Sequence, residues 1–195
     1  MGLFRKSEEE KLRIRQAKLR DDFLDACERG KRSDIEKLIA EGAAVNERNA
    51  DGTTPLFVAV NNGNIEATKL LIEKNADVNA KTISGAGFSD KFPVGSTPLL
   101  IACRMSDSAI ADILLKNSAD IKAQDCYGLT ALHYAAKRGN LPLIKLLLEN
   151  GADINAKDQF GHTAEFFARD NEHDAAATFL QAKSGNKPPP PQHKL

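Results

Sequence analysis

A sequence period of 33 residues is the feature that most restricts how this chain of 195 residues can fold. Thr97, Thr130 and Thr163 are each 33 positions apart, and Thr54 lies 43 positions before Thr97. A second phrase, seen as ADVNAK and ADINAK, follows the same spacing, so ten extra residues fall between Asn79 and Thr97. A fixed period of this length is typical of stacked repeat units, each of which needs its neighbours to bury its apolar faces.

Within each unit the residue pattern predicts a turn, two short helices and a second turn. Thr54 and Thr97 are favourable N-caps, and the proline that follows each suits the first position of a helix. In the second unit we expect helices over 56–60 and 65–73, with Gly63 as the left-handed residue between them. The same pattern predicts helices over 132–136 and 141–149, and helix ends at Gly42, Asn75, Gly139 and Gly151.

Two stretches, DGTTPLFVAVNNGNIEATKLLIEKNADVNAK and YGLTALHYAAKRGNLPLIKLLLENGADINAK, closely resemble ankyrin repeats. The resemblance covers roughly residues 16–182, by the period of this family. It implies an all-α repeat solenoid, an ankyrin stack of about five helix–turn–helix units with β-hairpin turns. It also implies a protein-binding surface, because no chemistry belongs to the fold itself. The expected units are 16–48, 49–81, 82–124 with the ten-residue insertion, 125–157 and 158–182.

The two ends of the chain depart from the shared pattern, as is expected of units that cap a stack. Glu165 stands where the middle units have leucine, and we expect the fifth unit to expose it because burying a carboxylate is costly. Residues 1–15 are expected to form a charged helical extension, with a membrane-surface anchor as the alternative. Residues 183–195 are expected to be a disordered proline-rich tail, with a ligand for a proline-recognition domain as the alternative.

The residues between the framework positions are the candidates for function. In the ankyrin family, hairpin tips and the exposed side of the first helices usually make the contacts, and the resemblance carries this to matching positions here. The hairpin tips carry apolar residues from the third unit onward, and the basic residues Arg104, Lys137 and Arg138 lie beside them. We therefore predict a partner with an acidic, partly apolar segment; the alternative is that the aromatic residues pack between adjacent hairpins. The predicted partner-binding residues are Phe88, Phe92, Arg104, Met105, Tyr127, Leu129, Lys137, Arg138, Phe160 and His162.

The insertion at residues 82–94 allows two interpretations. A long surface loop adds little closure entropy, about 0.6 kcal/mol per doubling of length, so it can be an inert insertion. Its phenylalanines, Phe88 and Phe92, favour instead a lengthened hairpin that contacts the partner. A phosphate-binding loop is the weaker alternative, because the GxxxxGK pattern is absent.

No residue pattern predicts catalysis, and we expect no cofactor, metal or small-molecule substrate. The family resemblance implies that His133 hydrogen-bonds within the turn framework, and a lone histidine has no acid–base partner. Cys27 and Cys103 are expected to pack in the core, whereas Cys126 is a candidate exposed thiol. The predicted function is a non-catalytic protein–protein interaction module that acts as an adaptor or an inhibitor.

The charge distribution argues against a general nucleic-acid binder. The formal net charge is zero, but residues 21–182 carry 17 basic and 24 acidic side chains, and both ends are basic. Nucleic-acid binding needs a basic face, and no apolar run is long enough to span a membrane. We expect a cytoplasmic monomer with one or more protein partners, because three cysteines without metal spacing fit a reducing compartment. The alternative is a regulatory subunit that docks on a membrane surface or nucleic acid through its basic ends.

Overall fold

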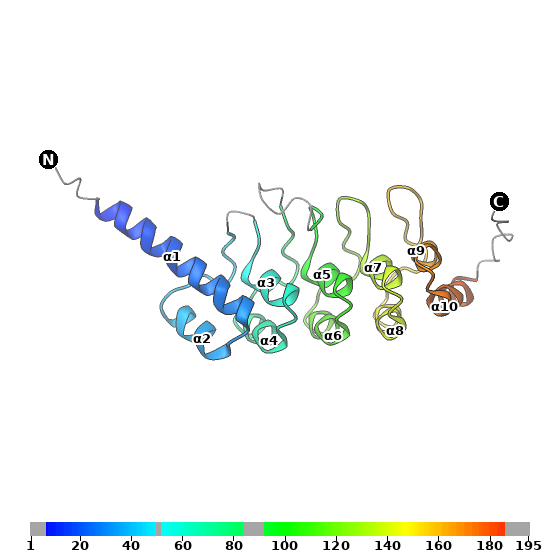
Figure 1. Cartoon of the computed structure of the whole chain (residues 1–195), viewed down its shortest axis with the longest axis horizontal. Coiled ribbons are helices and arrows are strands. Elements are labelled where there is room, and N and C mark those ends of the chain that lie inside the picture. The colour runs from blue at the N-terminus through cyan, green and yellow to red at the C-terminus, as the bar shows by residue number, and fades with distance from the viewer. Residues whose placement is uncertain (1–6, 50–51, 84–91, 186–195) are drawn as a thin grey trace.

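Ten helices stack as five pairs, and the residues that the structure describes contain no strand (Figure 1). The computed structural model describes residues 7–49, 52–83 and 92–185. The first helices of the pairs are α1 (Glu8–Arg29), α3 (Pro55–Asn61), α5 (Pro98–Arg104), α7 (Ala131–Lys137) and α9 (Ala164–Asp170). The second helices are α2 (Arg32–Ala40), α4 (Ile65–Glu73), α6 (Ser108–Lys116), α8 (Leu141–Glu149) and α10 (Asp174–Ser184). The predicted all-α repeat solenoid is confirmed, whereas the turns predicted as β-hairpins form no strands in the described residues.

The helix pairs lie side by side in chain order. Each first helix packs against the first helix of the next pair, and the second helices form a parallel row in the same way. In Figure 1 the first helices lie above the second helices, and the loops that join successive pairs project upward from the stack. Each unit therefore buries its apolar faces mainly on the units next to it, as expected for a linear repeat array.

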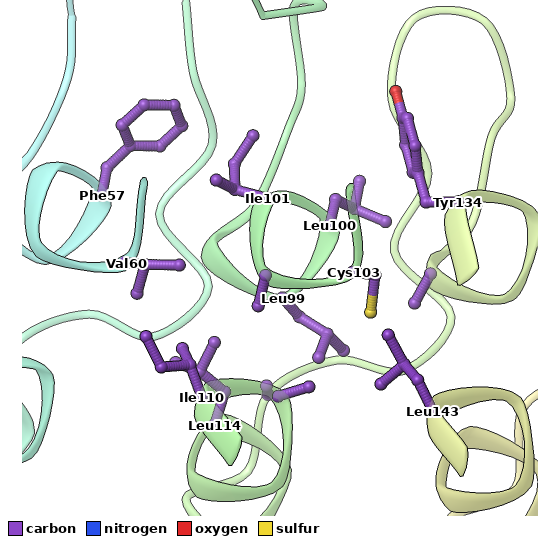
Figure 2. Close-up of a cluster of buried hydrophobic side chains, with 14 of the residues drawn as sticks. Phe57, Val60, Leu99, Leu100, Ile101, Cys103, Ile110, Leu114, Tyr134 and Leu143 are labelled. Atoms are coloured by element: carbon purple, nitrogen blue, oxygen red, sulfur yellow. The ribbon is translucent and has the colours of Figure 1, made fainter. Parts of the chain in front are cut away.

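One continuous apolar core runs along the stack. Figure 2 shows it around the third unit, where Leu99 of α5, Ile110 and Leu114 of α6 and Leu143 of α8 are fully buried. Burying a leucine or isoleucine side chain contributes about 1.5–3 kcal/mol to stability. Alanines allow adjacent first helices to approach closely, and those at five equivalent positions are all buried: Ala26, Ala59, Ala102, Ala135 and Ala168.

The helix ends follow the predicted capping pattern. The Thr54 hydroxyl accepts a hydrogen bond from the Phe57 N–H at 3.3 Å, and Thr97 caps α5 in the same way. Helices α4 and α8 have the predicted bounds. The left-handed residues Gly63, Asn75 and Gly139 have φ values of 69°, 64° and 64°. Three further residues adopt the left-handed conformation although none of them is glycine, so the sequence did not predict them: Ser106, Ser118 and Glu172.

Asparagine side chains join the first three units across their turns. The Asn46 amide donates to the Asn75 carbonyl at 3.0 Å and accepts from the Asp77 N–H at 2.8 Å. Asn79 makes the equivalent pair of bonds with the following unit. Lys122 occupies this place in the third unit, so the junction with the fourth unit has no asparagine at this position.

Helix α1 extends well beyond the stack at its N-terminal end (Figure 1). Phe23, Ala26 and Cys27 are buried against the neighbouring helices, whereas Leu12 and Ile14 are exposed. The helix is unbroken across the predicted boundary between residues 15 and 16, so the division into extension and first unit stays a prediction. At the other end α10 continues to Ser184, and residues 186–195 of the predicted tail lie outside the described residues.

The expected exposure of Glu165 is wrong. Only 16% of its side chain is exposed, and its carboxylate accepts from the Arg169 guanidinium at 2.9 Å. Arg169 also donates to the Gln181 amide oxygen at 2.8 Å, which holds it between α9 and α10. The fifth unit therefore compensates a half-buried carboxylate with a paired arginine, because an unpaired buried charge is far more costly.

Candidate binding surface

The hairpins between the third and fifth units are held by aspartates at their base. One Asp125 carboxylate oxygen accepts from the backbone N–H groups of Tyr127 and Leu129, at 2.9 and 3.0 Å. Asp158 makes the same two bonds, to Phe160 and His162, in the next hairpin. Burial would raise the pKa of Asp158, but the hydrogen bonds from His162 and Phe160 outweigh it and lower that pKa below its usual range. The turns are therefore fixed in shape by charged hydrogen-bond acceptors.

Adjacent hairpins are also joined to one another through their backbones. The Cys126 N–H donates to the Val94 carbonyl at 2.8 Å, and the Gln159 N–H donates to the Tyr127 carbonyl at 3.0 Å. The approach is close enough that a Cβ on Gly128 would lie 3.0 Å from the Gln159 nitrogen. Three successive hairpins therefore form one continuous edge.

Large apolar side chains are exposed along this edge. Val94, Tyr127 and Phe160 are 44%, 50% and 72% exposed, on three successive hairpins. The His162 ring stacks on Phe166 of α9, with ring centroids 3.9 Å apart. We call Tyr127, Phe160, His162 and Phe166 the aromatic patch. Clustered exposed aromatic residues are typical of contact sites.

Not every predicted tip residue is available for contact. Phe92 is buried, with 7% of its surface exposed, so the expectation that it is an exposed tip residue is wrong. Its ring packs edge-on against Phe57 at 4.9 Å, and the Arg104 guanidinium lies over it at 5.1 Å. Leu129 is half-buried against the core. Phe92 therefore packs on an aromatic residue of helix α3, and not between adjacent hairpins as the alternative interpretation had it.

The inserted loop is anchored at both of its described ends. The Thr82 N–H donates to the Ser96 carbonyl at 2.9 Å, and the Thr82 hydroxyl donates to the Pro93 carbonyl at 2.8 Å. Phe88 and the rest of residues 84–91 lie outside the described residues. Its role as a contact residue stays a prediction.

Phe166 was not among the predicted residues, although its exposed surface completes the patch. It stands 33 positions after His133, which is buried in the fourth unit. The next hairpin covers His133, whose Nε2–H donates to the His162 carbonyl of that hairpin at 3.2 Å. The fifth unit has no following hairpin within the described residues, so Phe166 is 42% exposed. Residue type alone gave no signal for this exposure, because Phe57 stands at the same repeat position in the second unit and is buried.

A basic surface lies next to the hairpin edge, on the ends of the first helices. Lys137 and Arg138 at the end of α7 are exposed, as is Met105 at the end of α5. With Arg104, Tyr134 and Asn171, the two α7 cations line a cavity of about 260 Å³. The structure therefore brings Arg104, Lys137 and Arg138 together as the sequence analysis expected.

The titratable groups inside the repeats are occupied by structural bonds. His133 Nδ1 accepts from the Thr130 N–H at 3.0 Å, which confirms its predicted place in the turn framework. Burial lowers the pKa of His133, so its neutral form is favoured. The Tyr134 hydroxyl donates to Asp125 at 2.6 Å, and burial together with this bond raises the pKa of Tyr134. These groups are therefore poorly placed for acid–base catalysis.

The cysteines have the predicted environments. Cys27 and Cys103 are fully buried on equivalent positions of α1 and α5, and burial raises the pKa of Cys27 to about 12. Cys126 is exposed at a hairpin tip. Among the described residues, no cluster of histidine, cysteine and carboxylate side chains could hold a metal ion. No helix in the described part of the chain is long and apolar enough to cross a bilayer.

Two curated proteins resemble short stretches of this chain. BRCA1-associated RING domain protein 1 of Caenorhabditis elegans is 46% identical over 46 residues, which cover 24% of this chain and 6% of that protein. Ankyrin repeat and SAM domain-containing protein 6 of Danio rerio is 38% identical over 63 residues, which cover 32% of this chain and 8% of that protein. The chain spans less than a tenth of the length of either relative.

A family comparison covers most of the chain. The family described as ankyrin repeats (3 copies) matches residues 23–125, 80–158 and 106–188. These matches extend from α1 to the end of α10 and include every hairpin described above. The chain therefore belongs to the ankyrin-repeat family.

Proposed function

We propose that this chain is a non-catalytic protein-binding module that contacts its partner through the aromatic patch and the adjacent ends of the first helices. Ankyrin repeats generally mediate protein–protein interaction, and the fold supplies no chemistry of its own. We further propose that the chain acts as an adaptor or an inhibitor that binds its partner through this surface.

The observation that carries this proposal is the exposure of aromatic side chains on hairpins whose backbones are fixed. Tyr127 and Phe160 lie on hairpins that share a backbone hydrogen bond and are each fixed by an aspartate. Aromatic residues held in place lose little conformational entropy on binding, and they are enriched among the residues that dominate interface energy. Soluble proteins rarely keep such side chains exposed and clustered without a partner.

A matched pair of variants tests the proposal. The test variant Tyr127→Ser/Phe160→Ser removes exposed aromatic surface from the patch, and the control Leu12→Ser/Ile14→Ser removes exposed apolar surface from α1. Each is used as bait, beside the unchanged chain, in extract of the cells that express it, and captured proteins are quantified by mass spectrometry. We expect the patch variant to lose a specific partner about tenfold or more, while the control keeps it.

Both variants must first show the same helical circular dichroism and a similar melting temperature as the unchanged chain. Capture that is equal for all three baits would contradict the proposed surface. A further bait without residues 84–91 tests whether the insertion contributes. A partner lost with that bait would support the lengthened hairpin as a contact element, and an equal yield would identify a tolerated insertion.

A further inference from the structure

A cavity on the ends of the first helices is lined mainly by cations. It is formed by Arg104 at the end of α5, Tyr134 and Lys137 of α7, Arg138 at the α7 C-cap and Asn171 at the α9 C-cap. Its volume is about 260 Å³, which suits one side-chain head group and not a whole drug-sized ligand. The cavity is therefore a pocket for a single functional group.

The two α7 cations have no acidic partner among the described residues. Arg138 donates through Nε to the Arg104 carbonyl at 2.9 Å, which orients its guanidinium and leaves its terminal nitrogens to face other groups. Lys137 makes no ion pair in the described part of the chain, in contrast to Lys11, Lys69 and Lys116, which each pair with a carboxylate on their own helix. Unpaired cations on a body that is otherwise acidic raise the local concentration of anionic groups.

The described acidic groups near this pocket form no ion pair with Lys137 or Arg138, and the negative charge of Asp125 offsets only part of the positive charge there. Both carboxylate oxygens of Asp125 are used, one by the backbone of its own hairpin and one by the Tyr134 hydroxyl. Asp170 follows at the α9 position that corresponds to Lys137, and it is exposed without an ion pair to that lysine in the described residues. The basic surface therefore covers the ends of α5 and α7 and stops at α9, where an acidic residue takes the equivalent position.

We propose that this pocket, formed by Arg104, Tyr134, Lys137, Arg138 and Asn171, binds the carboxylate of an aspartate or glutamate in an acidic segment of the partner. The inference rests on the proposed function and names the chemistry of its partner. The fixed Arg138 guanidinium supplies paired N–H donors that match a carboxylate, and Lys137 adds a second charge. Met105, 50% exposed beside Arg104, offers an apolar contact for the residue next to that carboxylate.

The same placement explains how the two parts of the surface would be used together. Tyr134 links the pocket to the hairpin edge through its bond to Asp125, which also holds the Tyr127 turn. We expect an extended segment with its acidic residue in the pocket to run toward the Tyr127 hairpin. Charge at the pocket then selects the partner and sets its orientation, while the aromatic contacts supply most of the affinity.

The test uses the full chain and random peptides, so the partner need not be identified first. A displayed library of random peptides of about 12 residues is selected on the immobilised chain, and the enriched peptides are measured by fluorescence anisotropy. The test variant is Lys137→Glu/Arg138→Glu. The control Lys74→Glu/Lys122→Glu makes the same charge change at two exposed lysines that form no ion pair among the described residues and do not line this pocket.

We expect enriched peptides to contain aspartate or glutamate beside an apolar residue. Binding should weaken about tenfold or more in the test variant and by no more than about twofold in the control. Replacing the peptide glutamate by glutamine should cause a similar loss, and affinity should fall as salt rises. Equal dissociation constants for the two variants, or enriched peptides without acidic residues, would overturn the inference.

Failure of the inference can be told apart from failure of the proposed function. Peptides that lose affinity in Tyr127→Ser/Phe160→Ser but not in Lys137→Glu/Arg138→Glu would leave the binding module standing and remove the carboxylate pocket. No enriched peptide, together with specific capture of a protein by the unchanged chain, would likewise remove the pocket alone. The absence of both peptide and protein binding would overturn both.

Discussion

The fourth and fifth repeat units share one register but differ in what lies beside them. His133 and Phe166 are 33 positions apart, yet the first is buried and the second is 42% exposed. Leu132 is buried at the position where Glu165 is held by Arg169. The fourth unit is covered by a following hairpin, and the fifth is not within the described residues. The repeat position of His133 and Phe166 therefore serves packing in one unit and exposure in the next.

The glycines of the two hairpins give the largest expected difference. Gly128 and Gly161 both have positive φ, at 76° and 84°. A Cβ at Gly128 would meet the Gln159 nitrogen and the Asp158 backbone, whereas a Cβ at Gly161 would meet nothing within 4 Å. Gly161→Ala should therefore cost only the left-handed conformation, about 1 kcal/mol. Gly128→Ala should cost about 2 kcal/mol more, because the neighbouring hairpin must also move.

Urea unfolding followed by circular dichroism would measure both variants against the unchanged chain. Equal losses would show that the hairpins separate without cost, which would contradict the continuous edge on which the binding proposal depends. Gly128→Ala should keep its helicity but weaken the hydrogen bond between the Gln159 N–H and the Tyr127 carbonyl. Amide hydrogen exchange at Gln159 should therefore be faster in this variant.

A smaller difference is expected from pH, because the fourth unit buries an ionisable ring where the fifth has phenylalanine. Burial lowers the pKa of His133 in the folded chain, while in the unfolded chain it is near 6.5. Between these values the unfolded state binds more protons, so the contribution of His133 to stability should fall as pH decreases below about 6.5 and stay constant above it.

His133→Gln should remove this contribution, so its stability should depend less on pH between about 5 and 7 than that of the unchanged chain. The measurement is the urea midpoint at several pH values for the two proteins. Slopes that are identical would mean that His133 does not stay neutral in the folded chain, contrary to the hydrogen bond that the Thr130 N–H donates to its ring.

The sequence predicted the parts of the molecule that depend on neighbours along the chain. The period located the helices, and threonine, proline and glycine marked their ends, so α4 and α8 have the predicted bounds. Exposure was harder to predict, because it depends on neighbours in space. Phe92 lies in an insertion with no equivalent in other units, so nothing in the period indicated that it would pack on Phe57. Phe166 is exposed because no further hairpin covers it within the described residues.

The smallest expected effect concerns the turn between the two helices of the fifth unit. Glu172 has φ of 61° where the fourth unit has Gly139 at 64°, and only glycine adopts this conformation without cost. Glu172→Gly removes that cost of about 1 kcal/mol, but glycine also makes the unfolded chain more flexible, which offsets part of the gain. We expect a net stabilisation of about 0.5 kcal/mol, seen as a higher urea midpoint with an unchanged denaturant dependence.

The converse change shows why the two turns are not interchangeable. A Cβ at Gly139 would lie 2.5 Å from the ring of His173, whose Nε2–H donates to the Lys137 carbonyl across the junction between the units. Gly139→Ala should therefore disturb that junction, whereas Glu172→Gly should leave it intact. If Glu172→Gly raises the midpoint of the whole helical transition, the fifth unit unfolds together with the fourth. A midpoint that does not rise would show that α9 and α10 unfold separately from the other helices. The aromatic patch would then lie on two units that come apart at different urea concentrations.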